Sequence, residues 1–171
     1  FWLFVGGSVG LVLFGLAAIY GTSLSEGGAG SGDFGNFWKQ IVFAGAGFLM
    51  IPLIATANYR LLANVAKPLY VIGAALLLAV LIFGKPVRGT TGWFGIGGFG
   101  IQPVELVKFF LIIYLAKFFA DYARDSESLA SIVRSGTAVG ALFLLVILQP
   151  DFGSAALLLA VWGALLLTAG V

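Results

Sequence analysis

The chain has 171 residues, of which 61% are hydrophobic and 9% are charged, and its formal net charge is +2. Its mean hydropathy is +1.11. In soluble domains, roughly a quarter of the residues are charged. If this chain were soluble, it would lack the polar groups needed to cover its surface. The composition therefore predicts an integral membrane protein, and the small, scattered positive charge gives no reason to expect a nucleic-acid partner.

Cysteine and histidine are both absent, so the chain contains no disulfide, no thiolate and no imidazole for proton transfer or zinc binding. We expect no cofactor and no metal site in this chain. Any chemistry must use carboxylates, Lys, Arg, Tyr or hydroxyl groups. Because Phe1 and Val171 both lie within apolar sequence, we expect a single membrane domain, 1–171, truncated at both ends.

A helix needs about 20 mostly apolar residues to cross the bilayer. Six candidate segments follow one another, at 1–20, 38–57, 68–83, 103–120, 137–148 and 155–171. The fifth is short for a full crossing. The sequence thus predicts an all-α fold, a polytopic helical bundle with about six transmembrane helices.

Basic residues are distributed unevenly between the two ends of these segments. Arg60, Lys67, Lys117, Arg124 and Arg134 fall on one face, against Lys39, Lys85 and Arg88 on the other. Lys and Arg accumulate in cytoplasmic connections. The glycine-rich connection 85–102 is therefore predicted to lie outside the cell, with Trp93 in the interfacial aromatic belt.

That connection and the head of the fourth segment concentrate the polarity of the chain. Gln102 followed by Pro103 is typical of a helix start, with Pro103 at the first position. Glu105 and Lys108 then share a helix face and can form an ion pair. In a structural interpretation, Glu105 complements the helix dipole and Lys108 extends to the interface. In a functional one, Lys108 and Arg88 bind an anionic head group in a polar pocket, and Glu105 holds Lys108 in place.

A second polar motif separates the fifth and sixth segments and consists of Gln149-Pro150-Asp151-Phe152-Gly153-Ser154. Pro150 removes a backbone donor and Gly153 relaxes the chain, so a helix break is expected here. Asp151 could simply cap the sixth helix. If the break lies below the membrane surface, Asp151 would instead face a polar interior near Glu105 and Lys108.

Together, these motifs resemble the SEDS family of shape, elongation, division and sporulation proteins. The resemblance rests on Arg88-Gly89-Thr90, Trp93-Phe94-Gly95-Ile96-Gly97-Gly98, Gln102-Pro103-Val104-Glu105-Leu106-Val107-Lys108 and the Gln149–Ser154 motif. It implies a peptidoglycan glycosyltransferase of the RodA/FtsW type in the bacterial cytoplasmic membrane. Such an enzyme polymerises lipid II during elongation or division and works with a class B penicillin-binding protein transpeptidase.

The resemblance also implies ten spans in the whole protein, with this chain supplying the first six, and a catalytic carboxylate in an outer loop beyond Val171. It assigns Arg88, Glu105 and Lys108 to the lipid-substrate cavity. The motif positions with a structural role are Trp93, Gln102, Pro103, Gln149, Pro150, Asp151 and Gly153. A divalent metal could assist the departing pyrophosphate in the whole enzyme.

Two other functions remain open from the sequence. Polar residues inside a bundle and a broken helix would also suit a flippase that moves lipid II between leaflets. The span pattern alone would also permit a non-catalytic membrane scaffold of the division or elongation machinery.

Overall fold

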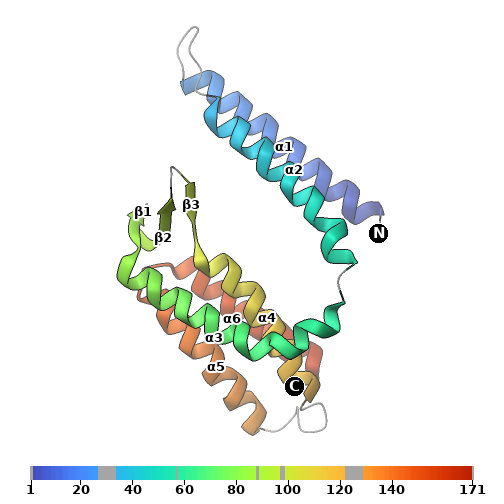
Figure 1. Ribbon diagram of the computed structural model, residues 1–171, viewed down its shortest axis with the longest axis vertical. Helices are drawn as coiled ribbons and strands as arrows, with labels where there is room; N and C mark the ends of the chain where they lie inside the picture. Colours follow the sequence, from blue (N-terminus) through green and yellow to red (C-terminus); the bar gives the residue numbers. More distant parts are fainter. Residues whose placement is uncertain are drawn as a thin grey trace. The chain divides into compact units, whose positions relative to one another are not determined.

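The computed structural model describes residues 2–26, 34–56, 58–87, 89–96, 99–121 and 129–170. The chain divides into two units, Phe1–Ala57 and Asn58–Val171, which are described in turn (Figure 1). Within these ranges, four helices are long and apolar enough to cross a membrane, over Val5–Leu24, Arg60–Phe83, Leu129–Ile147 and Phe152–Ala169. The chain is therefore a polytopic helical membrane protein, as the composition predicts.

The first unit is a hairpin of two helices, α1 (Trp2–Glu26) and α2 (Gly35–Ala55), which run side by side in opposite directions (Figure 1). Near their connection, the ring of Tyr20 lies 5.8 Å from that of Phe34 and 5.5 Å from that of Phe37, measured between centroids. This aromatic cluster joins the end of α1 to the beginning of α2, and it adds specific ring contacts to the apolar packing.

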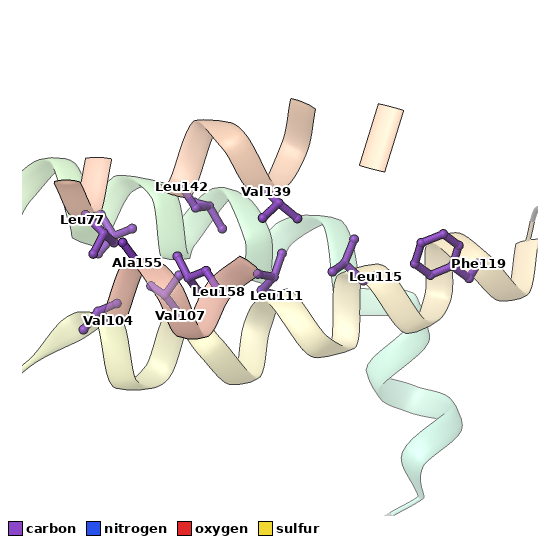
Figure 2. Packing of buried hydrophobic residues seen from close by; sticks show 11 residues of the cluster. Leu77, Val104, Val107, Leu111, Leu115, Phe119, Val139, Leu142, Ala155 and Leu158 are labelled. Carbon is purple, nitrogen blue, oxygen red and sulfur yellow. The ribbon is translucent and has the colours of Figure 1, made fainter. Parts of the chain in front are cut away.

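The second unit contains four helices, α3 (Tyr59–Phe83), α4 (Pro103–Asp121), α5 (Leu129–Ile147) and α6 (Phe152–Ala169). Helix α4 packs against the other three. Its buried residues recur every three or four positions and so form one face, made of Val104, Val107, Leu111, Leu115 and Phe119. Figure 2 shows this face meeting Leu77 of α3, Val139 and Leu142 of α5, and Ala155 and Leu158 of α6.

Small residues allow the helices of this unit to approach closely. A Cβ on Gly73 of α3 would lie 3.3 Å from side-chain atoms of Val107 on α4. On α5, a Cβ on Gly136 would lie 3.1 Å from the ring of Trp162 on α6. Close packing of this kind is a main source of helix association in membranes, where lipid removes the hydrophobic drive between helices.

The expectation of a short fifth span is wrong, because α5 has 19 residues and begins at Leu129. Its first half contains serine, arginine and glycine, and these residues conceal the helix in a search for apolar sequence. Ser131 and Ser135 are nevertheless buried. The Ser135 hydroxyl donates to the carbonyl oxygen of Ile132 and accepts from the indole nitrogen of Trp162, both at 3.1 Å. These bonds satisfy the polar group within the bundle.

Helix α3 also begins earlier than the expected residue 68. The side chain of Asn58 accepts a hydrogen bond from the backbone nitrogen of Arg60 at 3.1 Å, which caps the helix. Pro68 lies inside the helix instead of opening it. An interior proline removes one backbone hydrogen bond, and helices within a membrane bundle tolerate that loss.

The glycine-rich connection forms a small antiparallel sheet rather than an irregular loop. Its strands are β1 (Lys85–Val87), β2 (Thr90–Ile96) and β3 (Phe99–Ile101), in the order β1-β2-β3. Gly89 has a φ of +85° in the turn between β1 and β2, a conformation that glycine adopts without steric cost. The sheet follows α3 and leads directly into α4 (Figure 1).

Candidate functional site

The head of α4 carries the ion pair that the sequence spacing predicts. Pro103 is the first residue of the helix, and Glu105 lies in its first turn. The Lys108 ammonium lies 2.8 Å from Oε1 of Glu105, and the Lys108 side chain is 17% exposed whereas that of Glu105 is 57% exposed. A lysine whose side chain is largely covered by protein benefits from a carboxylate beside its ammonium. Glu105 therefore stabilises the positive charge of Lys108.

Asp151 links the head of α4 to the head of α6. Its Oδ1 accepts a hydrogen bond from the backbone nitrogen of Ser154 at 3.0 Å, which caps α6. Its Oδ2 accepts from Nε2 of Gln102 at 2.8 Å. The predicted cap is therefore present, and the same carboxylate also joins the residue that precedes α4. The first motif and the second meet through this hydrogen bond.

Gln149 is the most deeply buried polar residue of the second motif, at 1% exposure. Its side-chain Nε2 donates to the backbone carbonyl oxygen of Leu77 on α3 at 3.1 Å. Its backbone carbonyl oxygen accepts from the backbone nitrogen of Thr91 on β2 at 3.3 Å. A Cβ on Gly92 would lie 3.0 Å from Oε1 of Gln149. Glycine at this position therefore lets the strand lie close against the glutamine.

These hydrogen bonds form two neighbouring groups, one around Gln149 and one around Asp151, which are joined by the short turn between these two residues. We call them together the polar junction: Leu77, Thr91, Gln102, Gln149 and Asp151. It fastens the sheet to the C-terminal part of α3, the head of α4 and the turn between α5 and α6. Glu105 and Lys108 lie within the next two turns of α4. The chain passes through this region three times, at the end of α3, at the start of α4 and between α5 and α6. Because the hydrogen bonds join these passages, the junction fixes where the ion pair lies relative to the sheet.

The other predicted positions lie around the junction. Trp93 is half-buried on β2, and a Cβ on Gly100 of β3 would lie 2.9 Å from its ring; Trp93 therefore packs within the sheet. Pro150 belongs to the turn that separates α5 from α6, whereas Gly153 lies inside the first turn of α6, after that turn. Arg88 lies outside the described residues.

The sequence did not predict that Leu77 and Thr91 bind Gln149, nor that Gly92 lies close to it. Leu77 and Thr91 contribute backbone atoms, so their side-chain types carry no signal. No group of three acidic side chains that could hold a metal ion occurs within the described ranges. The arrangement is suited to binding and orienting a negatively charged, membrane-bound group beside the Lys108 ammonium.

The hydrogen bond between Gln102 and Asp151 is expected to couple the two motifs energetically. In a double-mutant cycle of Gln102→Ala and Asp151→Ala, the free energies of unfolding should be non-additive by about 1.5 kcal/mol, because the bond has a charged acceptor. Thermal or denaturant unfolding of the purified full-length protein measures this coupling. Additive effects of the two substitutions would show that the motifs are energetically independent.

The comparisons with known proteins agree with the motifs. The family model for the FtsW/RodA/SpoVE cell cycle proteins matches residues 2–171. A probable peptidoglycan glycosyltransferase FtsW from Thioalkalivibrio sp. (strain K90mix) is 32% identical over 166 residues, which cover 93% of this chain and 41% of that protein. Stage V sporulation protein E from Bacillus subtilis (strain 168) is 32% identical over 135 residues, which cover 77% of this chain and 37% of that protein.

Two solved structures resemble the fold. The crystal structure of the rod shape determining protein RodA from Thermus thermophilus has a TM-score of 0.73 and 29% identity, covering 94% of this chain and 53% of that one. A structure described as coordinating polymerization and crosslinking in a peptidoglycan synthase complex has a TM-score of 0.66 and 30% identity, covering 86% of this chain and 44% of that one.

The chain spans about two fifths of the length of the curated relatives that it matches. Within that portion, the family match extends over nearly every residue and includes both motifs of the polar junction. The chain therefore belongs to the FtsW/RodA/SpoVE family of cell cycle proteins, the family that its motifs resemble.

Proposed function

We propose that the protein is a peptidoglycan glycosyltransferase that polymerises lipid II in the bacterial cytoplasmic membrane. The observation that carries this proposal is the polar junction, in which the two family motifs meet beside the Glu105–Lys108 pair. Family membership supports it further, because several relatives bear the name of this activity.

The reaction transfers a glycan from one lipid-linked pyrophosphate to the sugar of another. A sugar hydroxyl attacks the anomeric carbon, a base removes the hydroxyl proton, and the bond between that carbon and the pyrophosphate oxygen breaks. Negative charge therefore develops on the departing lipid pyrophosphate. A positioned cation stabilises such a charge most effectively where water is scarce.

Lys108 is the residue of this chain that we assign to that part of the reaction. Its side chain is largely covered by protein, and it lies near the head of α4, where a lipid pyrophosphate would enter from the membrane surface. Glu105 positions the ammonium, and the polar junction holds both relative to the sheet. Arg88 would contribute a second positive charge. The base is expected beyond Val171, and the chain itself then binds and orients the substrate.

The arrangement of the whole protein forms part of the same proposal. Helices α2 and α4 would cross the membrane together with the four apolar ones, which gives six spans in a single membrane domain and ten in the complete protein. In α4, the four charged residues Glu105, Lys108, Lys117 and Asp121 lie towards its two ends. A class B penicillin-binding protein transpeptidase would crosslink the product. The relative described as a synthase complex combines polymerization with crosslinking.

The test uses the protein expressed from its complete gene and purified, with fluorescent lipid II in proteoliposomes. We expect glycan polymers on a gel, and none from a matched purification that lacks the protein. If labelled lipid moves between the leaflets and no polymer forms, the proposed function would be that of a flippase and not of a glycosyltransferase. If the protein, with the transpeptidase present, forms no polymer and moves no lipid, the scaffold function would be the one supported.

A further inference from the structure

A second polar site lies at the end of α3 and α4 that is remote from the sheet. There a cavity of about 460 Å³ is lined by Ala66, Lys67, Tyr114, Lys117, Phe118 and Asp121. Its volume falls within the range of small-ligand sites, roughly 300–1,000 Å³. The described residues of its lining all belong to two neighbouring helices of the second unit. It shares no residue with the polar junction.

The position of the cavity along the helices places it at the opposite membrane surface from the junction. Lys67 lies sixteen residues before Phe83 at the end of α3, and Lys117 lies fourteen residues after Pro103 at the start of α4. With a rise of 1.5 Å per residue, these separations are about 24 and 21 Å. The hydrocarbon core is about 30 Å thick. If Phe83 and Pro103 mark one surface of the core, the backbone of the two lysines lies about 6 and 9 Å short of the other surface, and a lysine side chain extends from there towards the head groups.

The lining carries an excess of positive charge. Lys67 is exposed and forms no ion pair with any residue that the structure describes. Lys117 is paired with Asp121, at 3.0 Å from its ammonium to Oδ2. Of the three charged groups that the structure describes in the lining, one ammonium is thus left uncompensated. Anions should enter the cavity in preference to cations.

Aromatic rings give the cavity a preformed wall. The ring of Tyr114 lies 4.6 Å from that of Tyr70, measured between centroids, and stacks with Phe118 at 6.5 Å. The Tyr70 hydroxyl donates to the carbonyl oxygen of Ala138 on α5 at 2.8 Å, which anchors the group to a third helix. The Tyr114 hydroxyl forms no hydrogen bond with any described residue, so it is available to a ligand.

We propose that this cavity binds the phosphate head group of an anionic membrane lipid. Lys67 and Lys117 would contact the phosphate oxygens, the Tyr114 hydroxyl would donate a hydrogen bond, and Phe118 would contact the glycerol and upper acyl chains. Basic pockets between transmembrane helices bind phospholipid head groups in this way. The cavity lies where head groups are the most concentrated source of phosphate. This binding goes beyond the proposed glycosyltransferase activity and does not depend on it.

The experiment measures phosphatidylglycerol binding to the purified full-length protein by native mass spectrometry, during titration from neutral detergent. The test variant is Lys67→Gln combined with Lys117→Gln. The matched control is Arg60→Gln combined with Arg134→Gln, which removes two exposed charges from the same end of α3 and α5, outside the cavity. At a contribution typical of basic residues near a membrane surface, the test variant should bind about 10- to 30-fold more weakly. The control should bind like the wild type.

Three further arms make the result specific. A variant with Lys67→Arg and Lys117→Arg keeps both positive charges and should bind like the wild type. Asp121→Asn should bind up to about fivefold more strongly than the wild type, because it frees Lys117 from its partner. Inorganic phosphate should compete only weakly. Equal binding by the test variant and the control would overturn the proposal. Weaker binding by Asp121→Asn would also overturn it, and full competition by inorganic phosphate would assign the cavity to a soluble anion instead of a lipid.

Discussion

Replacing Lys108 with Ala in the full-length protein is expected to lower lipid II polymerisation by about 100-fold, the lower end of the usual effect of removing one charge-stabilising group. The bundle should remain folded. The substitution leaves Glu105 without its partner, but this side chain is 57% exposed and can be hydrated. Polymer formation with fluorescent lipid II measures the effect, and thermal unfolding confirms that the variant is intact.

Two companion variants make this prediction specific. Glu105→Gln should reduce polymerisation less, because it removes the ion pair and leaves the Lys108 ammonium in place. Arg134→Ala removes an exposed positive charge from α5 and should have no effect. Wild-type activity of a stably folded Lys108→Ala protein would contradict the role that we assign to the ammonium.

Replacing Gly84 with Ala is expected to destabilise the protein by about 3 kcal/mol, at the upper end of what overpacking costs. Gly84 follows the last residue of α3 as its C-cap, and its φ of −67° and ψ of 151° can be adopted by any residue. The obstacle is space, because a Cβ would collide with the backbone carbonyl oxygens of Thr91 and Val80. Both are backbone atoms and cannot rotate away. The sheet would have to separate from the end of α3, which would weaken the polar junction.

The matched control is Gly140→Ala on α5, where an added Cβ meets no atom within 4 Å. Alanine is favoured over glycine inside a helix by about 0.5–1 kcal/mol, so this variant should be as stable as the wild type or slightly more stable. Tryptophan fluorescence during thermal unfolding of the full-length protein compares the two. Equal midpoints would contradict the close contact between β2 and the end of α3.

The helices could be predicted from sequence largely because apolar composition is a local property. The predictions were wrong where polar residues are accommodated by tertiary contacts. Ser135 of α5 is satisfied by a bond from Trp162, 27 residues away, and no local pattern indicates that bond. The sheet was missed for a related reason. Its three strands are short and rich in glycine, and Gly100 is required there by the ring of Trp93 on the neighbouring strand.

The candidate site divides in the same way. The Glu105–Lys108 pair follows from a spacing of three residues on one helix, so the sequence was sufficient. The bond between Gln102 and Asp151 joins residues 49 positions apart, and the bond from Gln149 to Leu77 spans 72 positions. Both depend on how α3, α4 and α6 pack. Family resemblance indicated that these motifs matter, whereas the structure gave the contacts that connect them.

The most direct test of the central claim is photocrosslinking of lipid II to the head of α4. A photoreactive phenylalanine analogue in place of the exposed Glu105 of the full-length protein should crosslink to lipid II in proteoliposomes, and unlabelled lipid II should compete. The same analogue in place of the exposed Leu129, at the start of α5, should not crosslink. Equal crosslinking at both positions, or none at position 105 in an enzyme that still polymerises, would contradict the placement of the lipid substrate beside the polar junction.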